Sequence, residues 1–343
     1  MVEPSNFKLS FAAVVVCGAM NNFPYCVMIG ASQDLARQFH VPHQTPVMST
    51  CMMLGSLLAT FINMKWLIGI EYKKRLLMVL LMTAGSYLGV SLAVTNAFPD
   101  GWFWSCCFAA VLTLAQIFGE LGILAFLRSF PPELVGGWGT GTGVAGILSS
   151  FMYILLRGPL NLSSSLVFVL CLPSLVIFWL SFEYLRWETT NSLSGPKLEF
   201  ALGGGRNLLD QTDPKAVVDS KVGPGAAVAS VENVKAALHV SGDIVANLVA
   251  AYSFKYFIYP GLDDRETYCA QNKWFPAMWM CYNIGVLLSR ASVSLLRVQR
   301  VWFLTCFQAI NVIAWVIEIC TGAIRSGLPH NYGYFVMSGW MMV

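Results

Sequence analysis

Residues 119–146 read GELGILAFLRSFPPELVGGWGTGTGVAG and place an acid and a glycine cluster within mostly apolar sequence. Taken alone, the run from Gly141 through Gly143 to Gly146 matches the dinucleotide-binding fingerprint GxGxxG. That fingerprint requires a preceding strand and a surrounding βαβ unit. Here two prolines precede the glycines and the apolar run ILSSFMYILL follows them. We therefore predict that these glycines contact another helix instead of a dinucleotide phosphate.

Composition places the chain in a membrane. Its 343 residues are 56% hydrophobic and only 11% charged, whereas an average soluble domain is about 25% charged. Apolar runs long enough to cross about 30 Å of hydrocarbon recur along the chain. The predicted fold class is therefore an all-α polytopic membrane protein with about ten transmembrane helices. We expect spans at residues 9–32, 47–69, 76–97, 102–127, 136–156, 163–185, 239–260, 274–296 and 300–323, with a tenth that opens near residue 331.

One change in composition divides the chain into three parts. Residues 1–185 carry six predicted spans. Residues 186–237 are polar, rich in Gly, Pro and Ser, and have no periodic apolar face, so we expect a disordered cytoplasmic loop. Residues 238–343 carry about four more spans. Two six-helix halves joined by a central loop are typical of a major-facilitator-type transporter, so we expect the second half to be incomplete, as in a chain truncated at its C-terminus.

The distribution of lysine and arginine predicts the orientation. With a cytoplasmic N-terminus, thirteen of the 21 basic residues fall on the cytoplasmic side and five on the opposite side, as the positive-inside rule requires. Asn161 begins the one Asn-x-Ser/Thr sequence in the chain. In this orientation it faces the lumen and is a candidate glycosylation site.

Several function classes are disfavoured by the same composition. The net charge of +3 is small and dispersed, so we predict no nucleic-acid partner. Most of the ten cysteines lie inside predicted spans, where cysteine behaves as a small apolar residue. The four histidines have no metal-ligand spacing. No nucleophile–base pair or metalloprotease motif occurs among the spans, and we predict no enzyme activity, no metal and no cofactor.

Polar side chains inside the spans mark a candidate pathway for a solute or ion. A charge at the bilayer centre costs about 2.5–3.5 kcal/mol, so it usually faces the protein interior or a water-filled cavity. Glu120 would bind a cation or a proton, and Lys255 and Arg290 would bind an anionic group. In the structural alternative, Glu120 pairs with Lys255 or Arg290 and only orders the helices. The candidate pathway also includes three polar residues of the first span, namely Asn21, Asn22 and Asp34.

The glycines of the fifth predicted span are candidates for helix packing. Small residues spaced four apart let membrane helices approach closely. Gly139, Gly143 and Gly146 fall at i, i+4 and i+7, and Gly137 and Gly141 form a second such pair. We predict close contact between this span and others of the same half.

Four sequence blocks carry a family resemblance. They are Asn21-Asn22-Phe23 with Tyr25, Val27-Met28 and Asp34; Gly119-Glu120; Trp138 with Gly141-Thr142-Gly143 and Ala145-Gly146; and Tyr282 with Gly285-Val286, Ser289-Arg290 and Ser292. On these blocks the chain resembles the battenin family, the lysosomal and vacuolar membrane proteins defective in juvenile neuronal ceroid lipofuscinosis. One family motif of the seventh span is altered, because Lys255 stands where the family has an acid.

The resemblance implies a major-facilitator-like fold in the membrane of lysosomes, vacuoles or equivalent acidic organelles. It also implies a part in organelle pH, in basic amino-acid homeostasis and in clearing glycerophosphodiesters. The favoured function is export of a small polar metabolite from an acidic lumen, with proton coupling through Glu120. Two alternatives stay open. One is a non-transporting factor that regulates organelle pH through cytoplasmic trafficking partners bound at residues 186–237, and the other is a nucleoside-type facilitator.

Overall fold

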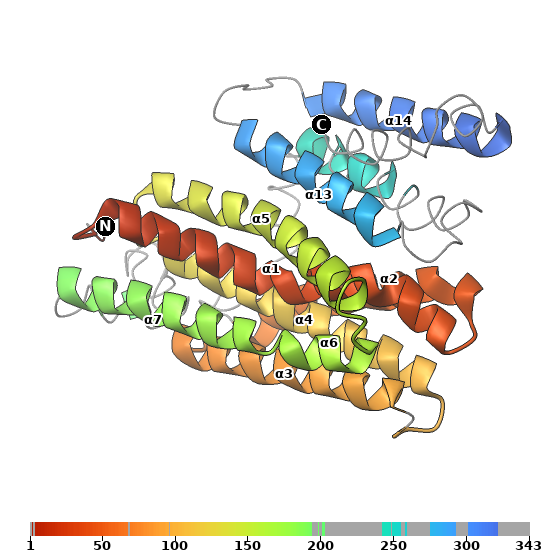
Figure 1. Cartoon of the computed structure of the whole chain (residues 1–343). Coiled ribbons are helices and arrows are strands. Elements are labelled where there is room, and N and C mark those ends of the chain that lie inside the picture. Colours follow the sequence, from red (N-terminus) through yellow and green to blue (C-terminus); the bar gives the residue numbers. More distant parts are fainter. Residues whose placement is uncertain are drawn as a thin grey trace.

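The protein is seen in a computed structural model that describes residues 2, 4–67, 69–95, 97–193, 198, 201–202, 242–247, 249–254, 258, 275–292 and 301–321. Within these residues all regular secondary structure is helical (Figure 1). The tenth predicted span and most of the loop at 186–237 lie outside the described residues.

Six apolar segments of the described chain are long enough to cross a membrane. The all-α membrane-spanning class is therefore confirmed. The helix that covers the end of the sixth predicted span continues past residue 185 to Ser192. The segments are α1 (Phe7–Gln38), the short η1 (Pro42–Gln44) with α2 (Thr45–Ile62), α3 (Tyr72–Val94), α4 (Gly101–Leu127), α5 (Pro132–Arg157), and α6 (Ser164–Leu170) with α7 (Pro173–Ser192).

Two further long helices coincide with the eighth and ninth predicted spans. They are α13 (Phe275–Ser292) and α14 (Val301–Thr321). Within these helices, the stretches Trp279–Ser289 and Trp302–Glu318 are apolar. Residues 242–247 and 249–254, which fall in the seventh predicted span, are also helical.

Local sequence signals set where the helices begin. The Asn6 side chain accepts a hydrogen bond from the Leu9 N–H at 3.1 Å and caps α1, as asparagine commonly does. Proline occupies the first turn of α2, α5 and α7, where its missing N–H costs nothing. Pro24 lies inside α1 and removes one backbone hydrogen bond from the middle of that helix.

Helix α1 lies at the centre of the bundle and α2 at its edge. In the most apolar window of α1, 67% of the residues are buried, whereas the figure for the second segment is 28%. α1 packs most extensively on α5 and also contacts α4 and α7, while α4 is flanked by α3 and α2 (Figure 1). α13 lies against α5 on the side away from α3. A residue that points from α1 toward α4 therefore lies inside the protein and away from lipid.

Glycine allows α1 and α5 to meet backbone to backbone. A Cβ added at Gly141 would lie 2.1 Å from the carbonyl oxygen of Val15, and one added at Gly18 would lie 2.6 Å from that of Trp138. Both distances are far shorter than a van der Waals contact, so no side chain fits at either position. The predicted close contact is therefore present at Gly141.

Gly137 also faces α1, where an added Cβ would lie 3.3 Å from Phe11, whereas the remaining predicted packing glycines face elsewhere. A Cβ added at Gly143 would meet Leu287 at 3.0 Å, and one added at Gly146 would meet the Asn283 side chain at 1.8 Å. Both partners belong to α13, outside the first half. Successive residues turn by about 100° around a helix, so Gly141 and Gly143 face different neighbours. A Cβ at Gly139 would meet nothing within 4 Å in the described part of the chain.

Candidate functional site

A polar cluster made of Asn21, Asn22, Gln116 and Glu120 joins α1 to α4. The Gln116 side-chain amide donates to Asn22 Oδ1 at 3.2 Å and to Glu120 Oε2 at 3.0 Å. The Asn21 amide donates to the backbone carbonyl of Gln116 at 3.1 Å, and the Asn22 amide donates to the carbonyl of Gly18 at 3.2 Å. Three of the predicted site residues are thus brought together by a fourth residue, Gln116.

Burial is graded across the polar cluster. Asn21 is 3% exposed and Gln116 is 8% exposed, while Asn22 and Glu120 are half-buried. A Cβ added at Gly119 would lie 2.0 Å from Asn21 Oδ1, so only glycine lets the asparagine reach the backbone of α4. The glycine that precedes Glu120 is therefore needed to assemble the site.

The polar cluster combines three amide side chains with one carboxylate. An ionised carboxylate only accepts hydrogen bonds, and an amide offers one oxygen and two N–H donors. Gln116 uses its amide nitrogen to bridge the Asn22 oxygen and the Glu120 carboxylate. Glu120 and Asn22 are thus linked through one shared donor, and the role of Glu120 as a proton or cation site stays a prediction.

Arg75 of α3 reaches the neighbouring turn of α4. Its side chain is 4% exposed, its Nε donates to the Phe118 carbonyl at 3.0 Å, and its guanidinium also hydrogen-bonds the Asn63 side chain. A Cβ added at Gly122 would lie 2.9 Å from Arg75 Nε. Arg75 is one of the thirteen basic residues that the orientation argument placed on the cytoplasmic side, and glycine at 122 is the local feature that makes room for it.

Asp34 lies outside the polar cluster, at the end of the bundle where α1 is followed by η1 and α2. We call this the α1–α2 end, and we call the opposite end, where α2 leads into α3, the α2–α3 end. Twelve residues separate Asn22 from Asp34, which corresponds to about 18 Å along a helix. Asp34 Oδ2 accepts from the Tyr153 hydroxyl at 2.8 Å and from Arg157 Nε at 3.4 Å. Asp34 therefore connects α1 to the end of α5.

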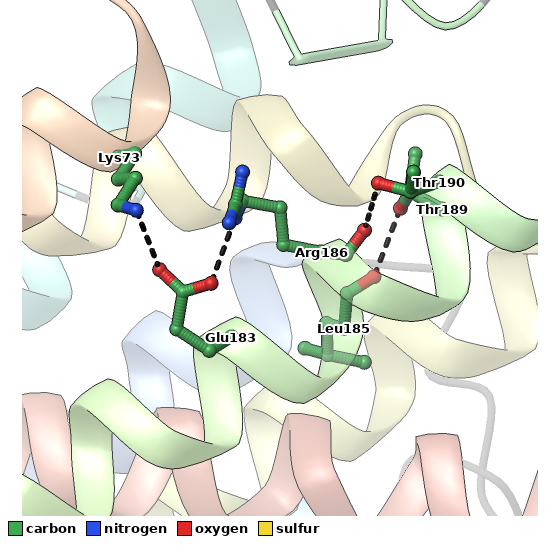
Figure 2. A network of polar contacts seen from close by, with 6 residues as sticks. All are labelled: Lys73, Glu183, Leu185, Arg186, Thr189 and Thr190. Carbon is green, nitrogen blue, oxygen red and sulfur yellow. Dashed lines mark hydrogen bonds and ion pairs between the residues drawn. The ribbon is translucent and has the colours of Figure 1, made fainter.

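A second ion-pair cluster, formed by Lys73, Glu183 and Arg186, lies at the α2–α3 end (Figure 2). Glu183 Oε2 accepts from Arg186 Nε at 2.8 Å, and Glu183 Oε1 lies 3.6 Å from Lys73 Nζ. Lys73 is 42% exposed and Arg186 is 32% exposed. Side chains this exposed anchor α3 to α7 in solvent and do not form a buried binding site.

The remaining predicted residues are placed only in part. Lys255 and the side chain of Arg290 lie outside the described residues. Asn161 is exposed in the turn between α5 and α6, with φ of 47°, a conformation that asparagine tolerates better than most residues. Its glycosylation stays a prediction. No group of three His, Cys, Asp or Glu side chains in the described ranges is placed to hold a metal ion.

Comparison with known proteins gives a consistent result over nearly the whole chain. The family model described as CLN3 protein matches residues 12–340. Battenin of Dictyostelium discoideum is 27% identical over 325 residues, which cover 88% of this chain and 75% of that protein. Battenin of Canis lupus familiaris is 25% identical over 93% of this chain and 76% of its own length. Protein BTN1 of Kluyveromyces lactis is 26% identical over 100% of this chain and 81% of its own length.

Proposed function

Since this chain belongs to the CLN3 family, as its four sequence blocks predict, we propose that it is a secondary transporter of the lysosomal or vacuolar membrane. It exports a small polar metabolite from an acidic lumen and has its N-terminus in the cytoplasm. We further propose a major-facilitator-like arrangement, in which α1 to α7 form the first half. Family membership supports the membrane location, and the polar cluster supports transport.

The observation that carries the proposal is the polar cluster in the middle of the bundle. Amide and carboxylate groups are costly to place among helices in a membrane, and the backbone contact of α1 with α5 at Gly18 and Gly141 uses none. Helices of this bundle can therefore pack closely without polar side chains at the contact. Their presence between α1 and α4 is better explained by contact with a solute or ion.

Protonation of Glu120 would rearrange the hydrogen bonds of the polar cluster. The ionised carboxylate accepts a hydrogen bond from Gln116. A protonated carboxyl group becomes a donor as well, so it competes for the acceptors that Gln116 now serves. Loading a proton at Glu120 thus changes what Asn22 and Gln116 can offer to a solute. We propose this exchange as the coupling step.

The substrate class follows from the same acceptors. A carboxylate beside amide oxygens binds a cationic group most strongly. A basic amino acid and a glycerophosphodiester that carries an ammonium group both present such a group. These two classes are also the ones that the family resemblance implies, and we propose that the cationic part of the substrate binds at Asn22 and Glu120.

Flux measurements with the purified chain in proteoliposomes test this proposal. A pH gradient is imposed, and entry of labelled arginine or glycerophosphocholine is followed for wild type, Glu120→Gln and Glu183→Gln. Loss of gradient-driven flux in Glu120→Gln, with normal flux in Glu183→Gln, is the expected result. Equal flux in Glu120→Gln and wild type removes the coupling role.

The same preparation separates transport from the non-transporting alternative. If wild type moves neither solute, the alternative function through residues 186–237 becomes the better one. Deletion of residues 186–237 in cells then tests this non-transporting function. A normal organelle pH after the deletion would contradict it. Competition of the flux by nucleosides would instead favour a nucleoside-type facilitator.

A further inference from the structure

Helix α13 lies in a seat that is formed by glycines of two first-half helices. On α5, a Cβ added at Gly143 would lie 3.0 Å from Leu287, and one added at Gly146 would lie 1.8 Å from Asn283. The contact moves forward along α5 while it moves backward along α13, so the two helices run antiparallel. Both contacts depend on the absence of a side chain on α5.

The seat continues onto α1 through Gly30. A Cβ added there would lie 3.5 Å from the Trp279 ring, so a methyl group would fit but a large side chain would displace the indole. Trp279 stacks on Tyr282, with ring centroids 4.9 Å apart and an angle of 11° between the ring planes. The two rings are 4% and 2% exposed. An aromatic pair of α13 is therefore packed against the backbone of α1.

The contact with α13 and α14 lies toward one end of the bundle. The apolar cluster nearer the α1–α2 end contains first-half residues such as Leu35 and Tyr153, and it also includes Trp279, Tyr282 and Val286 of α13 and Trp315 of α14. The apolar cluster nearer the α2–α3 end, which includes Tyr72 and Phe182, contains no described residue of α13 or α14. The described parts of these two helices thus cover the α1–α2 end of the core.

The wall that receives α13 is braced at the same end. Asp34 lies one turn after Gly30 on α1 and accepts hydrogen bonds from Tyr153 and Arg157 of α5. These bonds join α1 to α5 beside the aromatic pair. The α1–α5 wall is therefore held together by its own contacts, and α13 can move away from it as a separate element.

We propose that α13 closes the α1–α2 end of the transporter, with Trp279 on Gly30 as the plug. In the proposed orientation this end faces the lumen, so a solute enters from the lumen only when α13 separates from the α1–α5 wall. The inference rests on the proposed transport function and identifies the described conformation as lumen-closed.

A reversible crosslink tests whether the seat must open during transport. A Cβ at position 143 lies 3.4 Å from Leu287 Cβ, close to the separation found in disulfides, so Gly143→Cys combined with Leu287→Cys should crosslink on oxidation. Gradient-driven flux in proteoliposomes should then be lost and should return with a reductant. Wild type under the same oxidation is the control. Full flux in the crosslinked variant overturns the proposal.

Thiol labelling tests the closure without any flux, so it still decides if wild type transports nothing and the proposed function fails. Ser150 is 1% exposed and lies one turn beyond Gly146 on the same face of α5. The antiparallel register places it level with Trp279. Ser150→Cys supplies the one cysteine within residues 129–157, and its reaction with a membrane-impermeant maleimide is measured by mass spectrometry of that peptide.

Second substitutions in Ser150→Cys then displace or remove the plug. Gly30→Phe pushes Trp279 away and should raise labelling about tenfold, because overpacking opposes the closed state. Gly30→Ala is the matched control and should leave labelling low. Trp279→Ala removes the plug without adding bulk and should also raise labelling. Equal labelling in Gly30→Phe and Gly30→Ala, or unchanged labelling in Trp279→Ala, contradicts the proposal.

Discussion

Helix α1 meets α5 and α4 in opposite ways. Against the middle of α5 it makes a backbone contact, because Gly18 and Gly141 leave no side chain between the two helices at those positions. Against α4 it presents the amides of Asn21 and Asn22, which hydrogen-bond Gln116. The glycine motif that most resembles a ligand-binding loop therefore builds scaffold, and the polar chemistry lies one helix away.

The largest effect is expected for Gly141→Ala, which disturbs the contact between α1 and α5. The added methyl would lie 2.1 Å from the Val15 carbonyl oxygen, so the helices must separate. We expect a loss of about 3 kcal/mol in the free energy of unfolding, as for severe overpacking. Gly139→Ala is the matched control, because its methyl meets nothing within 4 Å. Thermal unfolding in detergent measures both, and equal midpoints would contradict the packing described.

On the α1–α4 side, Gln116→Leu removes the shared donor. Asn22 Oδ1 and Glu120 Oε2 each lose a hydrogen bond, and we expect a cost of about 2 kcal/mol. Glu120→Gln keeps an acceptor for Gln116, so its stability should stay within about 1 kcal/mol of wild type. Unfolding midpoints in detergent separate the two variants. A larger loss in Glu120→Gln than in Gln116→Leu would mean that the charge itself holds the helices together.

The smallest effects are expected at the two ends of the bundle. Tyr153→Phe removes the hydrogen bond from a fully buried tyrosine to Asp34, with an expected cost of about 1.5 kcal/mol. Glu183→Gln weakens only the exposed ion pairs of Figure 2, and we expect less than about 1 kcal/mol, reduced further by salt. Unfolding midpoints at low and high ionic strength test this ranking. Equal losses at both ends would refute it.

The sequence predicted the helices well because each span is a long apolar run with few interruptions. It also picked out Glu120, Asn21 and Asn22, together with Asp34, Lys255 and Arg290, since polar residues stand out in such runs. Gln116 was missed because it carries no charge, although it lies four residues before Glu120 and thus on the same helix face. The four-residue spacing between Gln116 and Glu120 is therefore the sequence signal that could have placed Gln116 in the site.

Other features of the site could not be predicted from the sequence, because they depend on how the helices are placed relative to one another. Arg75 lies near a helix start, where basic residues usually face solvent, and its burial requires the space beside Gly122 on another helix. Asp34 was grouped with the first-span amides, yet the length of α1 alone separates them. Gly139 follows the same spacing rule as its neighbours, but only the placement of the surrounding helices shows that a Cβ there would meet nothing within 4 Å among the described residues.

One turn of α4 receives side-chain donors from two other helices. The carbonyls of Gln116 and Phe118 already belong to the α4 backbone ladder, and they also accept from Asn21 of α1 and Arg75 of α3. Rotation of α4 about its axis would therefore break both contacts at once. α4 is therefore held by hydrogen bonds from both α1 and α3. A change at Glu120 that rotates α4 would also break the contact that Arg75 makes from the start of α3.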